Sequence, residues 1–311
     1  EKTLNKVHEY IGYDKEKIEK YLRKHSELFY FTFHKNLDHK NIEVIIAKKS
    51  FDRDKEIVKK INRIIKNFSL KSFNRYKSHD LKSGTGIDLS DEQIEAINNS
   101  LSAPVSIITG GPGSGKTTLV TTLVKLLEKL NLTIKLCAPT GRAAKRIAEN
   151  PGLAQFDPST IHRYLYSIKN KKNESFDVMI VDESSMIDIN LFLELLVSIP
   201  NGTSIVFIGD ADQLPPVSAG QPFNDLIKSE CINVSFLTGN FRQKEFSAIV
   251  KGARKIILGE EPEVSNNPQV SDLYFLEIPP NDQSNAILNN YFSILPANLI
   301  AVEENDIQMV T

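Results

Sequence analysis

A glycine-rich segment followed by a lysine and a threonine has the clearest chemical meaning in this sequence. It runs Gly110-Gly111-Pro112-Gly113-Ser114-Gly115-Lys116-Thr117, after the apolar run 105–108 and before a helical pattern of leucines. Glycines let backbone N–H groups surround phosphate oxygens, and a helix N-terminus adds a favourable dipole. Lys116 can bring positive charge to the outer phosphates and Thr117 a hydroxyl to Mg²⁺. A plain glycine-rich turn is the alternative, but strand, loop and helix follow in the order that a nucleoside triphosphate site requires.

We therefore expect ATP with Mg²⁺ at this loop. The residues predicted to contact the nucleotide there are Gly111, Pro112, Gly113, Ser114, Gly115, Lys116, Thr117 and Thr118.

Two adjacent carboxylates give the second chemical signal. Asp182 and Glu183 directly follow the apolar run 178–181. Ligands of open α/β folds bind at the carboxyl ends of the strands, where this pair would lie. Asp182, with Thr117, can hold Mg²⁺, and Glu183 can act as the general base for the attacking water. An acidic strand end or a helix cap is the alternative, although Asp188 is better placed to cap the next helix.

Short apolar runs that alternate with helical patterns must position these groups. The runs are 105–108, 134–138, 178–181, 205–208 and 234–237. Their length and continuity are typical of strands buried on both faces, and the alternation predicts an α/β fold with a doubly wound parallel sheet. We assign this domain to residues 85–265.

The segments on either side have a different pattern. Apolar residues at three- and four-residue spacing over 13–33 and 51–73 predict amphipathic helices, hence a small helical N-terminal domain at 1–84. The tail, 266–311, has strand-like runs at 273–278 and 307–310 and a helical stretch at 286–292. It is typical of a connection into a further domain.

Composition limits the cellular setting. The net charge is −1, yet residues 1–82 hold 21 Lys and Arg against 12 Asp and Glu. This basic segment could attract a phosphate backbone, although a solvated lysine-rich helix face is the commoner explanation. Cys137 and Cys231 are too few for a disulfide framework, which favours the cytoplasm. No run approaches the roughly 20 apolar residues of a membrane span. A chain that begins with Glu and has no leader is expected to be a fragment.

Five further segments carry a family resemblance. They are Ala138-Pro139-Thr140-Gly141-Arg142-Ala143-Ala144, Thr160-Ile161-His162, Asp182-Glu183-Ser184-Ser185, Gly209-Asp210-Ala211-Asp212-Gln213-Leu214-Pro215-Pro216-Val217 and Asn240-Phe241-Arg242-Gln243. In type and order they resemble superfamily 1 DNA helicases of the RecD class, the alpha subunit of exodeoxyribonuclease V and its stand-alone relatives, over about residues 89–311.

The resemblance implies a RecA-like P-loop NTPase domain and an ATP-dependent helicase that moves five-prime to three-prime on single-stranded DNA in recombination or repair. Other subunits of a helicase–nuclease complex are further candidate partners. Such helicases need two motor domains, and the second barely begins here. We therefore expect a fragment that binds ATP but hydrolyses it poorly and does not translocate. The alternative is a repair-complex subunit or nucleotide switch that binds ATP without translocating.

The resemblance also implies roles for three polar residues. Gln213 is similar to the sensor that touches the γ-phosphate, with a turn residue before two prolines as the alternative. Arg242 is similar to the arginine that stabilises charge on the transferred phosphate, with an exposed surface arginine as the alternative. Gln93 is similar to the glutamine that reads adenine, but Ser90 and Gln93 also have capping-box spacing.

DNA contacts are implied at two further segments. Thr140, Gly141 and Arg142, and later Thr160 and His162, are similar to motifs that grip single-stranded DNA through its phosphates. A helix cap at Thr140 and a buried or capping His162 are the alternatives. Residues 165–176, with a polar tip at 169–173, are similar to the hairpin that acts as a strand-separating pin, or form a plain surface turn.

Overall fold

The computed structural model describes residues 14–35, 41–68, 76–77, 88–170, 175–238, 247–265 and 272–273. The chain divides into two compact units, Glu1–Gly239 and Asn240–Thr311.

A six-stranded sheet forms the centre of the first unit, in the order β5-β4-β6-β7-β3-β8. The pairs β5–β4, β4–β6, β6–β7, β7–β3 and β3–β8 are all parallel, which confirms the predicted parallel sheet. All five apolar runs predicted within residues 85–265 are strands. The bounds are β3 Val105–Gly110, β4 Ile134–Ala138, β5 Ser159–Thr160, β6 Val178–Val181, β7 Ser204–Gly209 and β8 Asn233–Leu237.

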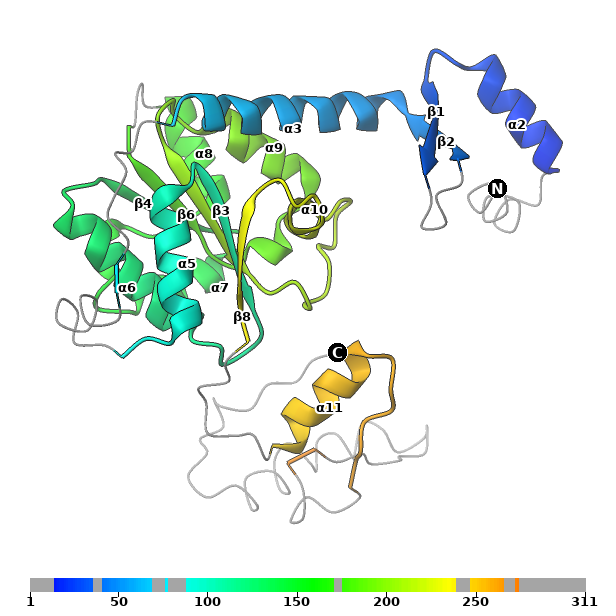
Figure 1. Cartoon of the computed structure of the whole chain (residues 1–311). Helices are drawn as coiled ribbons and strands as arrows, with labels where there is room; N and C mark the ends of the chain where they lie inside the picture. The colour runs from blue at the N-terminus through cyan, green and yellow to red at the C-terminus, as the bar shows by residue number, and fades with distance from the viewer. Residues whose placement is uncertain are drawn as a thin grey trace, which may run out of the picture. The chain divides into compact units, whose positions relative to one another are not determined.

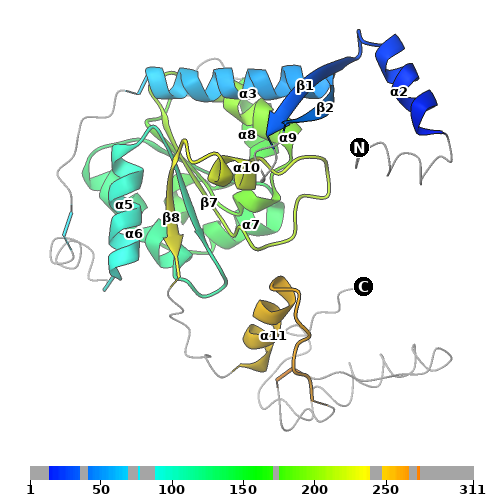
Figure 2. The same cartoon turned by 45° about the vertical axis from the view of Figure 1, so that its right-hand side comes forward.

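Helices cover both faces of this sheet, as Figures 1 and 2 show. One core layer lies under α5, α6 and α7, and the other under α3, α8, α9 and α10. Neighbouring strand residues point into opposite layers, Ile107 into the second and Ile108 into the first, so both must be apolar. The bounds are α3 Lys48–Lys66, α5 Asp91–Ser102, α6 Lys116–Lys129, α7 Gly141–Ala148, α8 Ile161–Asn170, α9 Ile189–Ser198 and α10 Pro222–Lys228.

The N-terminal segment is not all helical, contrary to the expectation. After helix α2, Lys15–Lys24, the chain forms the antiparallel pair β1, Phe29–Lys35, and β2, Asn41–Ala47. The helix predicted over 13–33 therefore ends early, because the aromatic and β-branched residues from Phe29 to Phe33 favour a strand. Helix α3 is confirmed. The predicted boundary near residue 84 lies outside the described residues and stays a prediction.

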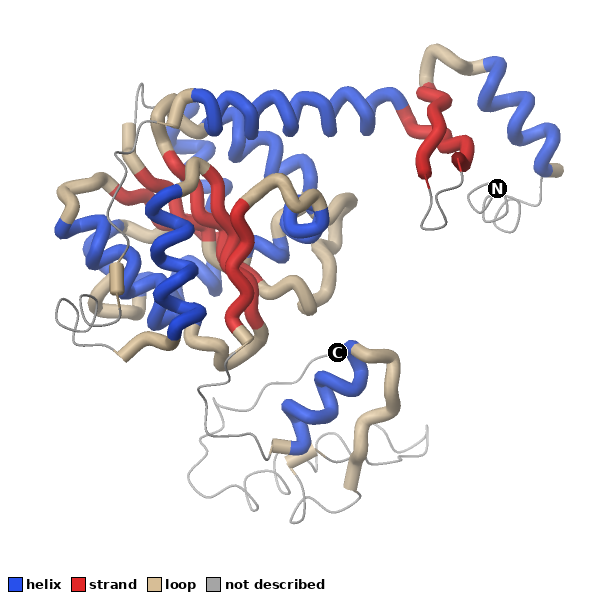
Figure 3. Tube along the Cα trace, viewed as in Figure 1, coloured by secondary structure: helices blue, strands red, loops and turns tan. Residues whose placement is uncertain are grey.

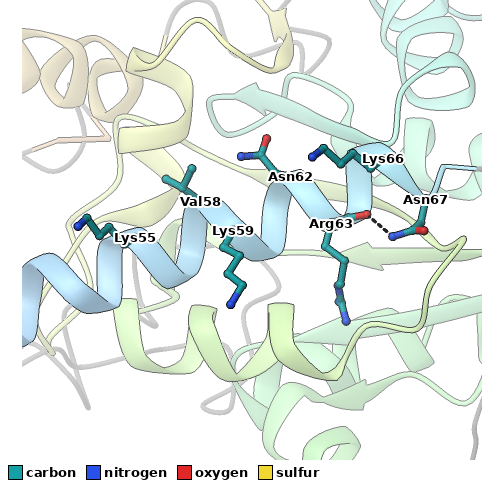
Figure 4. Close-up of a pocket in the computed structure, with 7 residues that line it drawn as sticks. All are labelled: Lys55, Val58, Lys59, Asn62, Arg63, Lys66 and Asn67. Carbon is teal, nitrogen blue, oxygen red and sulfur yellow. Dashed lines mark hydrogen bonds between the residues drawn. The ribbon is translucent and has the colours of Figure 1, made fainter.

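Helix α3 packs on the sheet domain through Ile57, Ile61 and Ile64, which are buried in the second core layer. Figure 4 shows Arg63 pointing from α3 toward the neighbouring helix, and its Nη2 donates to the carbonyls of Leu196, at 2.9 Å, and Ile199, at 2.7 Å. Both carbonyls lie at the C-terminal end of α9, where a cation is favourable. Arg63 therefore ties the N-terminal segment to the sheet domain.

Helix α3 carries further basic residues beside this contact. Seven residues line a surface hollow of about 500 Å³ along it: Lys55, Val58, Lys59, Asn62, Arg63, Lys66 and Asn67. The attraction of the basic segment 1–82 for a phosphate backbone stays a prediction.

The predicted hairpin at 165–176 is wrong in its first arm. Residues 165–170 continue helix α8. The physical reason is the spacing of Ile161, Tyr164, Leu165 and Ile168, which places all four on one helix face against the second core layer. The polar tip falls partly on residues 171–174, outside the described residues.

The second unit contains helix α11, Ala248–Ile257 (Figure 3). Ser247 caps it by accepting from Val250 N, and Asp272 accepts from Ser247 Oγ at 2.5 Å and from Ala248 N at 2.6 Å. The elements expected at 273–278, 286–292 and 307–310 lie, apart from Leu273, outside the described residues. Among the described helices, none has the length and apolar content to cross a bilayer.

Candidate nucleotide-binding site

Sheet order brings the chemically important loops together. Strands β6, β7 and β3 are neighbours, so the segments after them leave the sheet at one edge. These segments are the carboxylate pair after β6, the Gln213 loop after β7 and the phosphate loop after β3. Three predicted signals from separate parts of the chain therefore share one location.

The phosphate loop has the backbone that its glycines predict. Gly115 precedes α6 with φ +84°, a left-handed conformation that favours glycine. Gly110 needs its lack of a side chain for another reason, because an added Cβ would lie 2.7 Å from the carbonyl oxygen of Leu237 on β8. The loop thus lies directly beside β8.

Lys116 points into the phosphate loop. Its Nζ donates to the carbonyl oxygen of Gly110 and, at 3.0 Å, to that of Gly111. Burial lowers the pKa of Lys116, while the charges of Asp210, Glu183 and Asp182 oppose this shift. Those three carboxylates therefore surround the ammonium group closely enough to stabilise its charge.

Ser114 shows that the loop has unused hydrogen-bonding capacity. The residue is only 4% exposed, and its buried hydroxyl has no partner among the described residues. A buried hydroxyl without a partner is uncommon and points to a polar ligand. The donors in this loop therefore fit a phosphate group.

Asp182 and Glu183 follow β6 as predicted. Burial raises the pKa of Asp182, and a hydrogen bond from Glu183 N to Asp182 Oδ1, 2.9 Å long, partly offsets this effect. Glu183 has φ +52°, which a non-glycine residue adopts at a cost of about 1 kcal/mol or more. Such local strain is concentrated at functional sites, where it fixes the direction of a side chain.

The loop after β7 is fixed by side-chain hydrogen bonds. Thr109 Oγ1 accepts from Ala211 N, and Asp210 Oδ1 accepts from Asp212 N, both at 3.0 Å. At its tip, Gln213 is exposed, and its Oε1 accepts from Ser185 Oγ at 3.3 Å. Gln213 therefore lies next to the segment that carries the two carboxylates.

Sequence reasoning gave no role to Asp210 or Ser185. Asp210 is only 3% exposed and is the largest of the charges that raise the pKa of Lys116. Ser185 links the carboxylate segment to Gln213. Asp210 lies in the same family-like segment as Gln213, and Ser185 in the same segment as Asp182 and Glu183. Membership of these segments was the sequence signal that could have found both residues.

Gln93 lies at the other end of the phosphate loop. Its capping box with Ser90 is confirmed, since Gln93 N donates to Ser90 Oγ at 3.3 Å and Ser90 N donates to Gln93 Oε1 at 3.0 Å. Its Nε2 also donates to the Gly115 carbonyl at 3.4 Å. Gln93 is thus buried against the phosphate loop, and adenine contact stays a prediction.

The residues expected to contact DNA lie farther along the same sheet edge. Strands β4 and β5 pair, with Ala138 opposite Thr160. Thr140 Oγ1 accepts from Ala143 N at 3.2 Å, and Thr160 Oγ1 accepts from Arg163 N at 3.1 Å. Both threonines therefore cap helices, which confirms the helix-cap alternative for Thr140. Gly141, Arg142 and His162 are exposed. The buried alternative for His162 is therefore wrong, and DNA contact stays a prediction.

Thr117, Thr118 and Pro112 are exposed, and Gly111 and Gly113 are partly exposed. Arg242 lies outside the described residues. Among the described residues no group of three His, Cys, Asp or Glu could hold a metal ion. A magnesium ion held partly by phosphates needs no such group, because it commonly uses one or two protein ligands and keeps its waters.

The comparison with known families decides the membership. The model of the family described as AAA domain matches residues 88–269. The chain belongs to the AAA domain family. The match covers the sheet and every described residue of the candidate site.

Two relatives of this AAA domain carry RecD names. The ATP-dependent RecD2 DNA helicase of Deinococcus radiodurans is 37% identical over 180 residues, 56% of this chain and 24% of that protein. The RecBCD enzyme subunit RecD of Haemophilus influenzae is 37% identical over 165 residues, 44% of this chain and 26% of that protein. These matches confirm the RecD resemblance. The chain spans about a quarter of each relative.

A solved structure, the Pif1 helicase from Candida albicans, is 28% identical, covers 57% of this chain and 46% of its own, and has a TM-score of 0.42.

Proposed function

We propose that this chain is the nucleotide-binding part of an ATP-dependent DNA helicase that acts in recombination or repair. The observation that supports it best is the meeting of Lys116, the Asp182–Glu183 pair and the Gln213 loop at one sheet edge. The name of the Deinococcus radiodurans relative, a DNA helicase, supports DNA as the substrate. Translocation and strand separation are assigned to the whole protein, of which subunits of a helicase–nuclease complex are candidate partners.

Binding of the triphosphate rests on the phosphate loop. Lys116 would exchange the carbonyls of Gly110 and Gly111 for phosphate oxygens, which carry more negative charge. Ser114 and the backbone N–H groups at the start of α6 would donate to the same phosphates. Gln93 stands beside Gly115, where its amide could meet the base.

Hydrolysis would use the neighbouring loops. When bound, Mg²⁺ would neutralise negative charge on the phosphate oxygens and so make the γ-phosphorus easier for water to attack. Thr117 and Asp182 would hold the metal, and Glu183 would accept the proton of the attacking water. Gln213, held by Ser185, would orient that water, and Arg242 would balance the growing charge.

DNA would lie along the ends of β4 and β5. The starts of α7 and α8 lie there, so the positive ends of two helix dipoles would face the phosphates, and Arg142 would add charge to them. Such contacts grip phosphates without reading sequence, as a motor requires. The five-prime to three-prime direction is proposed from the family resemblance.

Calorimetry with ATP and Mg²⁺ tests the proposal. Lys116→Ala should weaken binding about 100-fold, since it removes a charged donor worth about 2.7 kcal/mol. Lys129→Ala, at the far end of the same helix, is the matched control and should bind normally. Absence of binding by the wild-type chain would refute the nucleotide site.

A second assay separates a motor from a nucleotide switch. In the whole protein, single-stranded DNA should stimulate ATP turnover, and Lys116→Ala should abolish it. Tight ATP binding without DNA-dependent turnover would instead identify a switch or an assembly subunit.

A further inference from the structure

The first turn of α5 contacts two separate partners. Glu92, one residue before Gln93, accepts two hydrogen bonds from Thr238: one from its backbone N, at 2.8 Å to Oε2, and one from its hydroxyl to Oε1. Both carboxylate oxygens are thus used by one residue 146 positions away in sequence. Hydrogen bonds to an ionised acceptor are stronger than those between neutral groups.

These contacts are part of a ring of interactions, here called the circuit, that joins the two ends of the phosphate loop. Its members are the pairs Gly110–Leu237, Thr238–Glu92 and Gln93–Gly115. Leu237 pairs with Gly110, the first residue of the loop, and Thr238 follows it. Glu92 holds Thr238, and the next residue, Gln93, holds Gly115 at the end of the loop. Both ends of the loop are therefore fixed, one by pairing with β8 and the other by Gln93. The Glu92–Thr238 contact joins these two attachments.

We infer that Glu92 and Thr238 are positioning residues that pre-organise the phosphate loop for nucleotide. They act on the loop through its two ends, Gly110 and Gly115. A loop held in its binding conformation loses less conformational freedom when ligand arrives, so affinity rises. The inference rests on the proposed function, because it assigns this loop to ATP.

Three variants test the inference in the whole chain. Thr238→Val removes the hydroxyl donor but keeps the backbone N–H, and we expect ATP–Mg²⁺ binding about tenfold weaker, the effect typical of one charged hydrogen bond. Thr238→Ser keeps the hydroxyl donor and should bind ATP–Mg²⁺ with the same affinity as wild type. Glu92→Gln keeps one acceptor oxygen and should fall between wild type and Thr238→Val.

Asn99→Ala is the matched control. Asn99 Nδ2 donates to Ser235 Oγ at 3.0 Å, so this pair also joins α5 to β8 but lies outside the circuit. If Asn99→Ala weakened ATP binding as much as Thr238→Val, the effect would be general helix docking and the inference would be overturned. Wild-type affinity in Thr238→Val would overturn it as well.

Hydrogen exchange of the amides in 110–116 separates this inference from the proposed function. Without nucleotide, exchange should be faster in Thr238→Val than in wild type, Thr238→Ser and Asn99→Ala. Should the wild-type chain bind no ATP, the proposed function would fail, but faster exchange would still support the circuit. Equal exchange in all four proteins would refute it.

Discussion

Replacing Asp182 by Asn should stabilise the protein while removing its use of magnesium. Burial raises the pKa of Asp182, so its ionised form is costly in the absence of metal. Asn is isosteric, and its Oδ1 can still accept the hydrogen bond from Glu183 N. The variant therefore removes the charge and leaves the local geometry in place.

The magnitude follows from two opposing contributions. Relief of desolvation favours the neutral amide, but loss of the carboxylate also removes one of the charges that stabilise Lys116. We expect a net gain on the order of 1 kcal/mol in the free energy of unfolding, within the range measured for buried polar groups. For a domain of this size that gain raises the Tm by about 2–4 °C.

The pH dependence has a definite sign. The folded-state pKa of Asp182 lies above its unfolded value, so the cost of ionisation is fully present at pH above the folded pKa. It disappears as the pH falls through that value toward about 3.9, because the carboxyl is then protonated in both states. The stability difference between Asp182→Asn and wild type should therefore shrink as the pH falls.

Thermal unfolding in EDTA, from about pH 7.5 to about pH 4, measures this difference. Calorimetry with ATP, with and without Mg²⁺, measures metal use, and the metal should strengthen binding to wild type only. A variant less stable than wild type at neutral pH would refute the electrostatic reasoning. Equal strengthening by Mg²⁺ in both proteins would refute the metal role.

Two further substitutions test the scaffold around the site. Arg63→Ala should lower the free energy of unfolding by about 2–3 kcal/mol in urea titrations, because two carbonyls at the end of α9 lose a charged donor. The control Lys59→Ala, on the same helix, should lower it by less than about 0.5 kcal/mol. Equal losses in the two variants would contradict the role of Arg63 as a cap of α9. Gly110→Ala should destabilise by about 2 kcal/mol and weaken ATP binding, since the added Cβ meets the Leu237 carbonyl at 2.7 Å, and an unchanged Tm and affinity would show that β8 can move away.

The sheet was predictable because its central strands, β3, β6 and β7, are buried on both faces. Continuous apolar runs such as 205–208 allow few alternatives when turn residues bound them and helical patterns separate them. The position of the candidate site was predictable for the same reason, since strand ends fix where Asp182 and Lys116 must lie. The two-residue strand β5 was not predicted, because Ser159 and Thr160 show no apolar run.

The errors fall where periodicity is ambiguous. The spacing of apolar residues over 29–33 also suits a helix, but their aromatic and β-branched side chains favour a strand, which pairs with β2. Residues 165–170 were assigned to a hairpin from the polar tip that follows them. The helical spacing of Tyr164, Leu165 and Ile168 carried the better signal, because core burial outweighs turn composition at a helix end.

The circuit around the phosphate loop contains contacts that the sequence alone does not predict. Capping-box spacing predicted that Gln93 would close the start of a helix, but the same turn also holds Gly115 and Thr238. No local pattern encodes the second pair of contacts, since they depend on where β8 enters the sheet. Because β8 pairs with β3 beside the loop, the start of α5 is joined to the end of β8 through Glu92 and Thr238. Gln93 therefore both completes a helix cap and contacts the phosphate loop, although the cap alone would explain its place in the sequence.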